Sequence, residues 1–215
     1  RTLLLKDGAL SEHVRIVAER DASLSEKEKE LLALDPIAGE DARKHPLFDT
    51  CRPAGFTICS WNYLAYALTL RQSLVETNPE ISFYIFIADR PDTDVADELQ
   101  GEHVIVVDET IAPEFEQMAQ LYSIMEYNTS VKPHCFEHLF DKLGHSVVIY
   151  LDPDILVLRT LNEIYSELAV EVDCMLTPHI TAPLDDGKQP DDLAIARAGI
   201  YNLGFLGLAN RPESR

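Results

Sequence analysis

Two aspartates, Asp152 and Asp154, have the residue type and the spacing needed to hold a hard divalent cation. They directly follow residues 147–151, the most apolar strand-like run of the chain, and Pro153 stiffens the turn between them. Ligands of open α/β sheets bind beyond the carboxyl ends of the strands, so two carboxylates at positions i and i+2 there can converge on one ion. Carboxylate oxygens suit Mg²⁺ or Mn²⁺, which usually share their shell with substrate phosphates. We therefore expect a metal site at this pair, although an Asp-x-Asp pair alone can also cap a turn or a helix.

The elements that must position this pair alternate between strands and helices from residue 55 onward. Apolar runs predict strands, and apolar residues at helical spacing predict helices. The alternation predicts a doubly wound α/β sheet. The expected strands are 56–60, 83–88, 104–107, 147–151, 174–177 and 204–208, and the expected helices are 62–77, 92–99, 113–127, 130–143 and 161–168, with Ser130 as an N-cap and Gly144 as a stop.

Residues 1–50 differ from the remainder. Residues 25–34 form a charge-laced helical pattern, and Pro36, Gly39 and Pro46 interrupt the stretch after it. We interpret 1–50 as a helical N-terminal appendage or the tail of a preceding domain. Residues 51–215 are the expected core, which we expect to be truncated at its C-terminus because the chain ends at Arg215 in a polar turn.

The charge of the chain restricts its partners. The formal net charge is -19, so the protein repels nucleic-acid phosphates and anionic membranes. The apolar and charged fractions, 46% and 26%, are those of an ordinary globular domain. A nucleoside diphosphate is also anionic, so binding one requires a cation or local backbone donors.

The four cysteines do not form a CxxC pair. Cys59, Cys135 and Cys174 lie in apolar stretches and are expected to be small buried hydrophobic residues, and Cys51 completes the set. We expect a reducing compartment and a cytoplasmic location. No apolar run approaches the ~20 residues of a transmembrane segment, and no secretory signal is visible.

Four segments in order resemble the GT-A-fold glycosyltransferases, especially the glycogenin-like and bacterial lipopolysaccharide-galactosyltransferase-like group. Residues 148–155 (VIYLDPDI) resemble the family's Asp-x-Asp segment, and 57–64 (TICSWNYL) resemble its first strand and nucleotide-facing loop. Residues 129–133 (TSVKP) resemble a donor-contacting segment, and 201–207 (YNLGFLG) resemble the strand entry beside the sugar. The resemblance covers about 160 residues, from Phe56 to the end.

This resemblance implies a GT-A-like (Rossmann-like) mixed, mostly parallel sheet flanked by helices. It also implies a metal-dependent, hexosyltransferase-like transfer from a nucleoside-diphosphate sugar, with a UDP-sugar as the default, to a hydroxyl of a saccharide or another acceptor. A bacterial cell-surface polysaccharide pathway would place this work at the inner face of the membrane. The resemblance also implies a further metal-ligating His beyond the stretch present here, which is not assigned. The catalytic residue is left unassigned as well.

Several residues are candidates for contacts with the donor. Lys132, in the first turn of a helix, could reach the diphosphate, although it could equally be a solvated surface lysine. Ser60 and Asn62 could bind the base or ribose or merely cap a helix. Tyr63 could stack on a base or have an apolar packing role.

Other candidates lie at the ends of further strands. Asp89 could contact the nucleoside or form a turn with the residues after it. Tyr150 belongs to the Asp-x-Asp segment and is assigned to the donor as well. Asn202 and Gly204 would border the sugar, because glycine permits close approach of the backbone. His179 is a possible acceptor or donor contact or a structural residue. The acidic residues at 185–186 and 191–192 suggest a surface loop or a substrate loop.

Two other function classes remain open. Haloacid-dehalogenase-type phosphatases also place Asp-x-Asp at a strand end, but there the motif opens the domain, whereas here it follows three predicted strands. The chain could also be a non-catalytic nucleotide-sugar-binding domain. Pyrophosphorylases and dinucleotide dehydrogenases are disfavoured because no glycine-rich loop follows any predicted strand.

Overall fold

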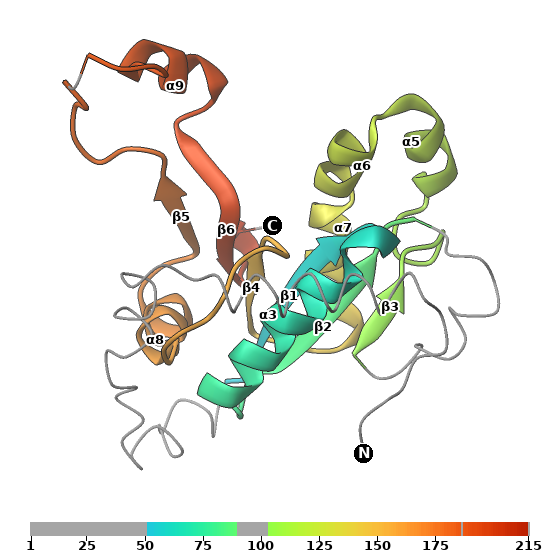
Figure 1. The fold of residues 1–215 in the computed structure, drawn as a ribbon. Coiled ribbons are helices and arrows are strands. Elements are labelled where there is room, and N and C mark those ends of the chain that lie inside the picture. The colour runs from blue at the N-terminus through green and yellow to red at the C-terminus, as the bar shows by residue number, and fades with distance from the viewer. Residues whose placement is uncertain (1–50, 90–102, 186, 215) are drawn as a thin grey trace.

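The computed structural model describes residues 51–89, 103–185 and 187–214. The appendage predicted for residues 1–50 and the helix predicted for 92–99 lie outside these described residues. Within them, six strands form one sheet in the order β3-β2-β1-β4-β6-β5 (Figure 1). The strands are β1 (Pro53–Cys59), β2 (Ser82–Ile87), β3 (Val104–Val106), β4 (Val147–Leu151), β5 (Cys174–Pro178) and β6 (Tyr201–Ala209).

The directions of the strands confirm the predicted mixed, mostly parallel sheet. β1 pairs in parallel with β2 and with β4, and β2 pairs in parallel with β3. β6 runs antiparallel to both β4 and β5. The sheet therefore has a parallel part, formed by β3, β2, β1 and β4, and an antiparallel part, in which β6 lies between β4 and β5.

Helices cover both faces of the sheet, as predicted. One face carries α3 (Leu64–Thr77), which follows the 3₁₀ turn η3 (Trp61–Tyr63), together with α8 (Asn162–Val170). The other face carries the helical run α5 (Phe115–Leu121), α6 (Ile124–Ser130), α7 (Lys132–Glu137) and the π-helical turn η4 (His138–Lys142). α9 (Asp192–Ala198) lies in the connection between β5 and β6, and η5 (Pro212–Ser214) follows β6.

The interior strands contribute to two hydrophobic cores, one on each face. In β4, Val148 and Tyr150 join the core beneath α5, α6 and α7, while Ile149 and Leu151 join the core beneath α3 and α8. Successive side chains of a strand point to opposite faces, so a strand buried on both faces must be apolar throughout. This explains the continuous apolar run that precedes Asp152.

The helical run over one face differs from the prediction. The single helix expected for residues 113–127 is two helices, because Ser123 caps a new helix: its hydroxyl accepts from the Glu126 N–H while Glu126 binds the Ser123 N–H in return. Ser130 does not cap a helix. Its hydroxyl donates to the Tyr127 carbonyl in the last turn of α6, so α7 follows α6 almost without a break. The predicted stop is confirmed, since Gly144 has a φ of +69°.

Burial confirms the prediction for two of the three cysteines. Cys59 and Cys135 are buried in the two cores. Cys174 is exposed, contrary to the prediction, because β5 forms the edge of the sheet. An apolar run could not reveal this, since it does not tell an interior strand from an edge strand.

The topology provides a crevice at one edge of the sheet. β2 and β4 lie on opposite sides of β1, so the order of the strands reverses at β1, and the carboxyl ends of all three meet at the same edge. Ligands of open α/β sheets bind at such a reversal. Antiparallel β6 brings its amino end to this edge, beside the carboxyl end of β4.

None of the helices that the structure describes is long and apolar enough to cross a bilayer.

Candidate functional site

A cavity of about 630 Å³ opens at this edge of the sheet. Its walls come from the loop after β1, the ends of β2 and β4, the start of β6, and the facing sides of α6 and α7. The cavity gathers all but one of the residues that the sequence nominates: Ser60, Asn62, Tyr63, Asp89, Lys132, Tyr150, Asp152, Asp154, Asn202 and Gly204. These residues belong to five separate segments of the chain, which therefore converge on one cavity.

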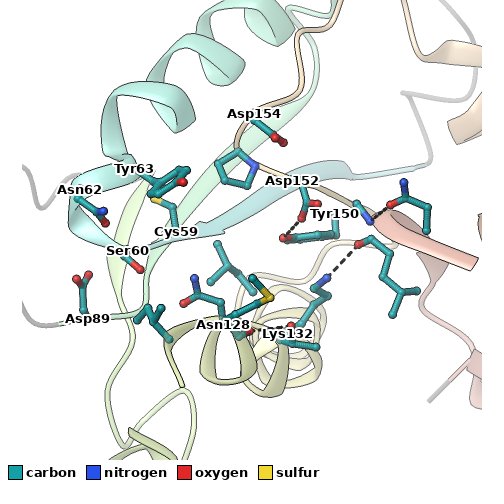
Figure 2. Close-up of a pocket in the computed structure, with 18 residues that line it drawn as sticks. Cys59, Ser60, Asn62, Tyr63, Asp89, Asn128, Lys132, Tyr150, Asp152 and Asp154 are labelled. Atoms are coloured by element: carbon teal, nitrogen blue, oxygen red, sulfur yellow. Dashed lines mark hydrogen bonds between the residues drawn. The ribbon is translucent and has the colours of Figure 1, made fainter. Parts of the chain in front are cut away.

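Polar groups of different kinds occupy different parts of this cavity. Figure 2 shows Ser60, Asn62 and Asp89 together at one end, and Lys132, Tyr150 and Asp152 together at the other. The first end offers hydroxyl, amide and carboxylate groups. The second end contains a lysine beside the aspartates.

Asp152 is held by its neighbours in a defined orientation. The Tyr150 hydroxyl donates to Asp152 Oδ1 over 2.6 Å (Figure 2). The Asp152 backbone N–H donates to the Gly204 carbonyl over 2.8 Å. Burial is the main reason that the pKa of the Tyr150 hydroxyl is raised, and Asp152 raises it further, so this phenol stays a proton donor. Asp154 is exposed at the rim of the same cavity.

Lys132 is not the solvated surface lysine that the sequence allowed. Its side chain is only 8% exposed, and its Nζ donates to the Leu203 carbonyl over 3.1 Å. The same ammonium lies 3.7 Å from the centroid of the Tyr150 ring, a cation–π contact. Burial lowers the pKa of Lys132, and the nearby Asp152 charge opposes that shift.

The loop after β1 is fixed by the end of β2. Asp89 Oδ1 accepts from the Trp61 N–H over 2.6 Å, which ties the two strand ends together. Ser60 is buried, and its side chain makes no capping bond to the 3₁₀ turn, so the capping role allowed by the sequence does not occur. Asn62 is exposed, and Tyr63 is half-exposed at 48%, with its ring centroid 5.5 Å from that of Tyr66.

Gly204 is required by close packing at the site. A Cβ placed there would lie 2.8 Å from Asp152 Oδ2 and 3.0 Å from Asn202 Oδ1. Asn202 Oδ1 in turn accepts from the Gly204 N–H over 2.8 Å. The start of β6 therefore packs directly against the carboxylate of Asp152, the residue after β4.

His179 lies away from this cavity. It is exposed at the end of β5, and its Nδ1 pairs with the Gly199 carbonyl over 2.8 Å. A carbonyl only accepts, so Nδ1 carries the proton. In the acidic connection, Asp191 caps α9 and Asp192 accepts from the Leu184 N–H, while Asp186 lies outside the described residues.

The cavity is also lined by residues that were not predicted from the sequence to belong to the site. Ile58, Cys59, Ile124, Met125, Asn128 and Leu203 all contribute to its walls. Burial, together with the Asp89 charge, raises the pKa of Cys59 to about 12, so this residue is a neutral thiol. Asn128 belongs to α6, which begins at the break after α5 that the capping box at Ser123 marks.

The carboxylate oxygens at the site fit a hard divalent cation that is also bound by oxygens from outside the protein. Asp152 and Asp154 supply carboxylate oxygens, the ligands that Mg²⁺ and Mn²⁺ prefer. Within the described part of the chain, no cluster of three or more His, Cys, Asp or Glu side chains is arranged to hold a metal. Phosphate and water oxygens would therefore have to complete the shell, as is usual for Mg²⁺ sites.

The comparisons with known proteins give solved structures alone. No protein-family model matches the chain, and no curated protein sequence matches it. The galactosyltransferase LgtC, solved with donor and acceptor sugar analogues, matches with a TM-score of 0.48 and 18% identity over 75% of this chain and 59% of LgtC.

Two further solved structures illustrate the range of these matches. The glycosyltransferase GlyE of Streptococcus pneumoniae gives a TM-score of 0.39 at 18% identity, over 76% of this chain and 35% of GlyE. Mouse xyloside xylosyltransferase 1 gives 0.38 at 13% identity, over 74% of this chain and 67% of the mouse protein. The chain thus spans about three fifths of the length of LgtC and about a third of that of GlyE.

Proposed function

We propose that this chain is the donor-binding core of a metal-dependent glycosyltransferase, which moves a sugar from a nucleoside-diphosphate sugar to an acceptor hydroxyl. One observation carries the proposal: every residue nominated for the metal or the donor, His179 apart, lines a single cavity at the reversal point of the sheet. Those residues come from five separate segments between 60 and 204, and a set of unrelated turn and cap residues would not be expected to converge in this way.

The two ends of the cavity suit the two parts of such a donor. Ser60, Asn62 and Asp89 offer hydrogen bonds for a base and a ribose, and Tyr63 offers a ring at the rim. Lys132 and the aspartates lie where a diphosphate would follow. Asn202 and Gly204 then border the sugar. UDP is the default nucleotide for this site.

A divalent cation at Asp152 and Asp154 resolves the electrostatic problem of an acidic protein that binds an anion. When bound, Mn²⁺ or Mg²⁺ would neutralise the diphosphate and stabilise it as a leaving group. The protein's own contribution is orientation: Tyr150 fixes the Asp152 carboxylate, and Lys132 supplies a fixed positive charge in a largely buried place. The acceptor hydroxyl then needs positioning more than a strong base.

Isothermal titration of UDP into the chain, first with Mn²⁺ and then with EDTA, tests this proposal. We expect binding that requires the metal, because the carboxylates repel an uncompensated diphosphate. A competition series with ADP, GDP and CDP in the presence of Mn²⁺ would then identify the base. If the folded chain binds none of these nucleotides with or without Mn²⁺, the proposed function is wrong.

A further inference from the structure

Lys132 carries a positive charge and lies beside Asp152, where a positively charged metal ion is proposed to bind. It extends from the first turn of α7 across the cavity floor, where its Nζ binds the Leu203 carbonyl at the start of β6. Its ammonium also lies over the ring of Tyr150, whose hydroxyl binds Asp152 Oδ1. One tyrosine therefore contacts both the lysine and the aspartate, which places the two charges close together.

The burial of this lysine makes its charge effective. Lys132 is 8% exposed, so little water screens the ammonium from the carboxylate. Burial lowers the pKa of Lys132, and the Asp152 charge opposes that shift. Charge pairs in such partly dry surroundings interact several times more strongly than exposed pairs do. A bare divalent cation approaching Asp152 meets attraction from the carboxylates and repulsion from Lys132.

A diphosphate reverses the effect of the same lysine. An ammonium has three N–H donors, and the bond to Leu203 uses one of them. Phosphate oxygens entering beside Asp152 can accept from the others, and their negative charge offsets the repulsion between Lys132 and a metal. The lysine is thus unfavourable to the metal alone and favourable to the metal with its phosphate ligands.

We propose that Lys132 sets the order of binding at this site: its ammonium opposes a free divalent cation at Asp152 and favours the cation that arrives with a nucleoside diphosphate. The inference rests on the proposed function and adds to it a positioning residue that couples metal binding to donor binding. In the absence of donor the site is weakly metallated, and the donor itself recruits the metal.

Two titrations, for which we expect opposite changes in affinity, test this inference. Mn²⁺ alone, and then UDP in the presence of Mn²⁺, are titrated calorimetrically into the wild type and into Lys132→Gln, which removes the positive charge and keeps a polar side chain. We expect the variant to bind Mn²⁺ alone about threefold or more tightly, since a repelling charge is gone. We expect it to bind UDP with Mn²⁺ about tenfold or more weakly, since a charged hydrogen bond is lost.

Lys142→Met is the matched control. It removes the same unit of charge from an exposed position on η4, outside the cavity, so both affinities should stay within about twofold of the wild type. Lys132→Met is a second neutral variant in case Lys132→Gln melts early by circular dichroism.

If the neutral variants bind Mn²⁺ alone no more tightly than the wild type, the inference is overturned, even where UDP binding remains metal-dependent and the proposed function stands. If the wild type binds neither Mn²⁺ nor UDP, both the inference and the proposed function fail.

Discussion

Gly204 lies so close to the Asp152 carboxylate that a methyl group there would displace it. The added Cβ in Gly204→Ala would lie 2.8 Å from Asp152 Oδ2, so the carboxylate must turn away from its bond with Tyr150. We expect Mn²⁺-dependent UDP binding to fall about tenfold or more by calorimetry, with little change in melting temperature. Gly207→Ala in the same strand is the contrast. Its Cβ would meet the Leu168 side chain, so it should lower the melting temperature and leave binding intact.

The two aspartates themselves can be tested with near-isosteric changes. Asp152→Asn and Asp154→Asn each remove a negative oxygen ligand without altering side-chain volume, so we expect loss of metal-dependent donor binding and an unchanged circular dichroism spectrum. Glu163→Gln, an exposed acid on α8, controls for the change in net charge. Wild-type titration curves for both aspartate variants would show that the metal site has been assigned to the wrong residues.

At the scale of elements, the capping box of α6 holds one wall of the cavity in place. Ser123→Ala removes the side chain that accepts from the Glu126 N–H, and the loss of such a cap costs about 1 kcal/mol. We expect faster hydrogen exchange for the amides of α6 and weaker UDP binding, because Asn128 and Met125 line the cavity from this helix. Ser73→Ala on α3, outside the cavity wall, should not affect exchange in α6. Unchanged exchange in α6 of the Ser123 variant would argue against this role.

The sequence predicts some of these elements well and others poorly, for physical reasons. β4 and α3 are predicted because the burial of β4 on both faces and of one α3 stripe leaves a periodic apolar pattern. The cap at Ser123 was missed because an apolar helical pattern runs through the break, and only the Ser-x-x-Glu spacing marks it.

The candidate site also has some features that the sequence predicts and others that it does not. Strand ends could be named from the sequence, because the carboxyl ends of parallel strands share an edge. Other features of the site could not be predicted, because each depends on two residues 28 or more positions apart and no local pattern encodes such pairs. They are the bond from Lys132 to Leu203, the bond between Asp89 and the Trp61 N–H, and the contact of Gly204 with Asp152.

At the scale of the whole molecule, His145 links the residue before β1 to β2, at the end of the sheet opposite the cavity. Its Nδ1 pairs with the Arg52 carbonyl and must carry the proton, so Nε2 accepts from the Tyr84 hydroxyl over 2.9 Å. Burial lowers the pKa of His145 below its ordinary value of 6.5. As the pH falls through that value, the unfolded chain takes up a proton that the folded chain does not, so stability is full above this range and declines below it.

Urea unfolding at pH 7.5 and at pH 5.5 measures this effect. We expect the wild type to lose stability at the lower pH, and we expect His145→Gln to lose less between the same two pH values. His179→Gln, which alters an exposed histidine, should keep the wild-type difference. An equal loss in the wild type and in His145→Gln would assign the pH dependence to other groups.

The antiparallel position of β6 also has a consequence for how the protein is made. A ribosome releases β1, β2 and β4 first, and these strands can pair with one another in parallel while the remainder of the chain is still in the exit tunnel. β5 emerges next, but its partner in the described sheet is β6, which must insert between β5 and β4. Asn202, Leu203 and Gly204 arrive with β6, so the nascent protein has a folded half-sheet before this part of the cavity wall is in place.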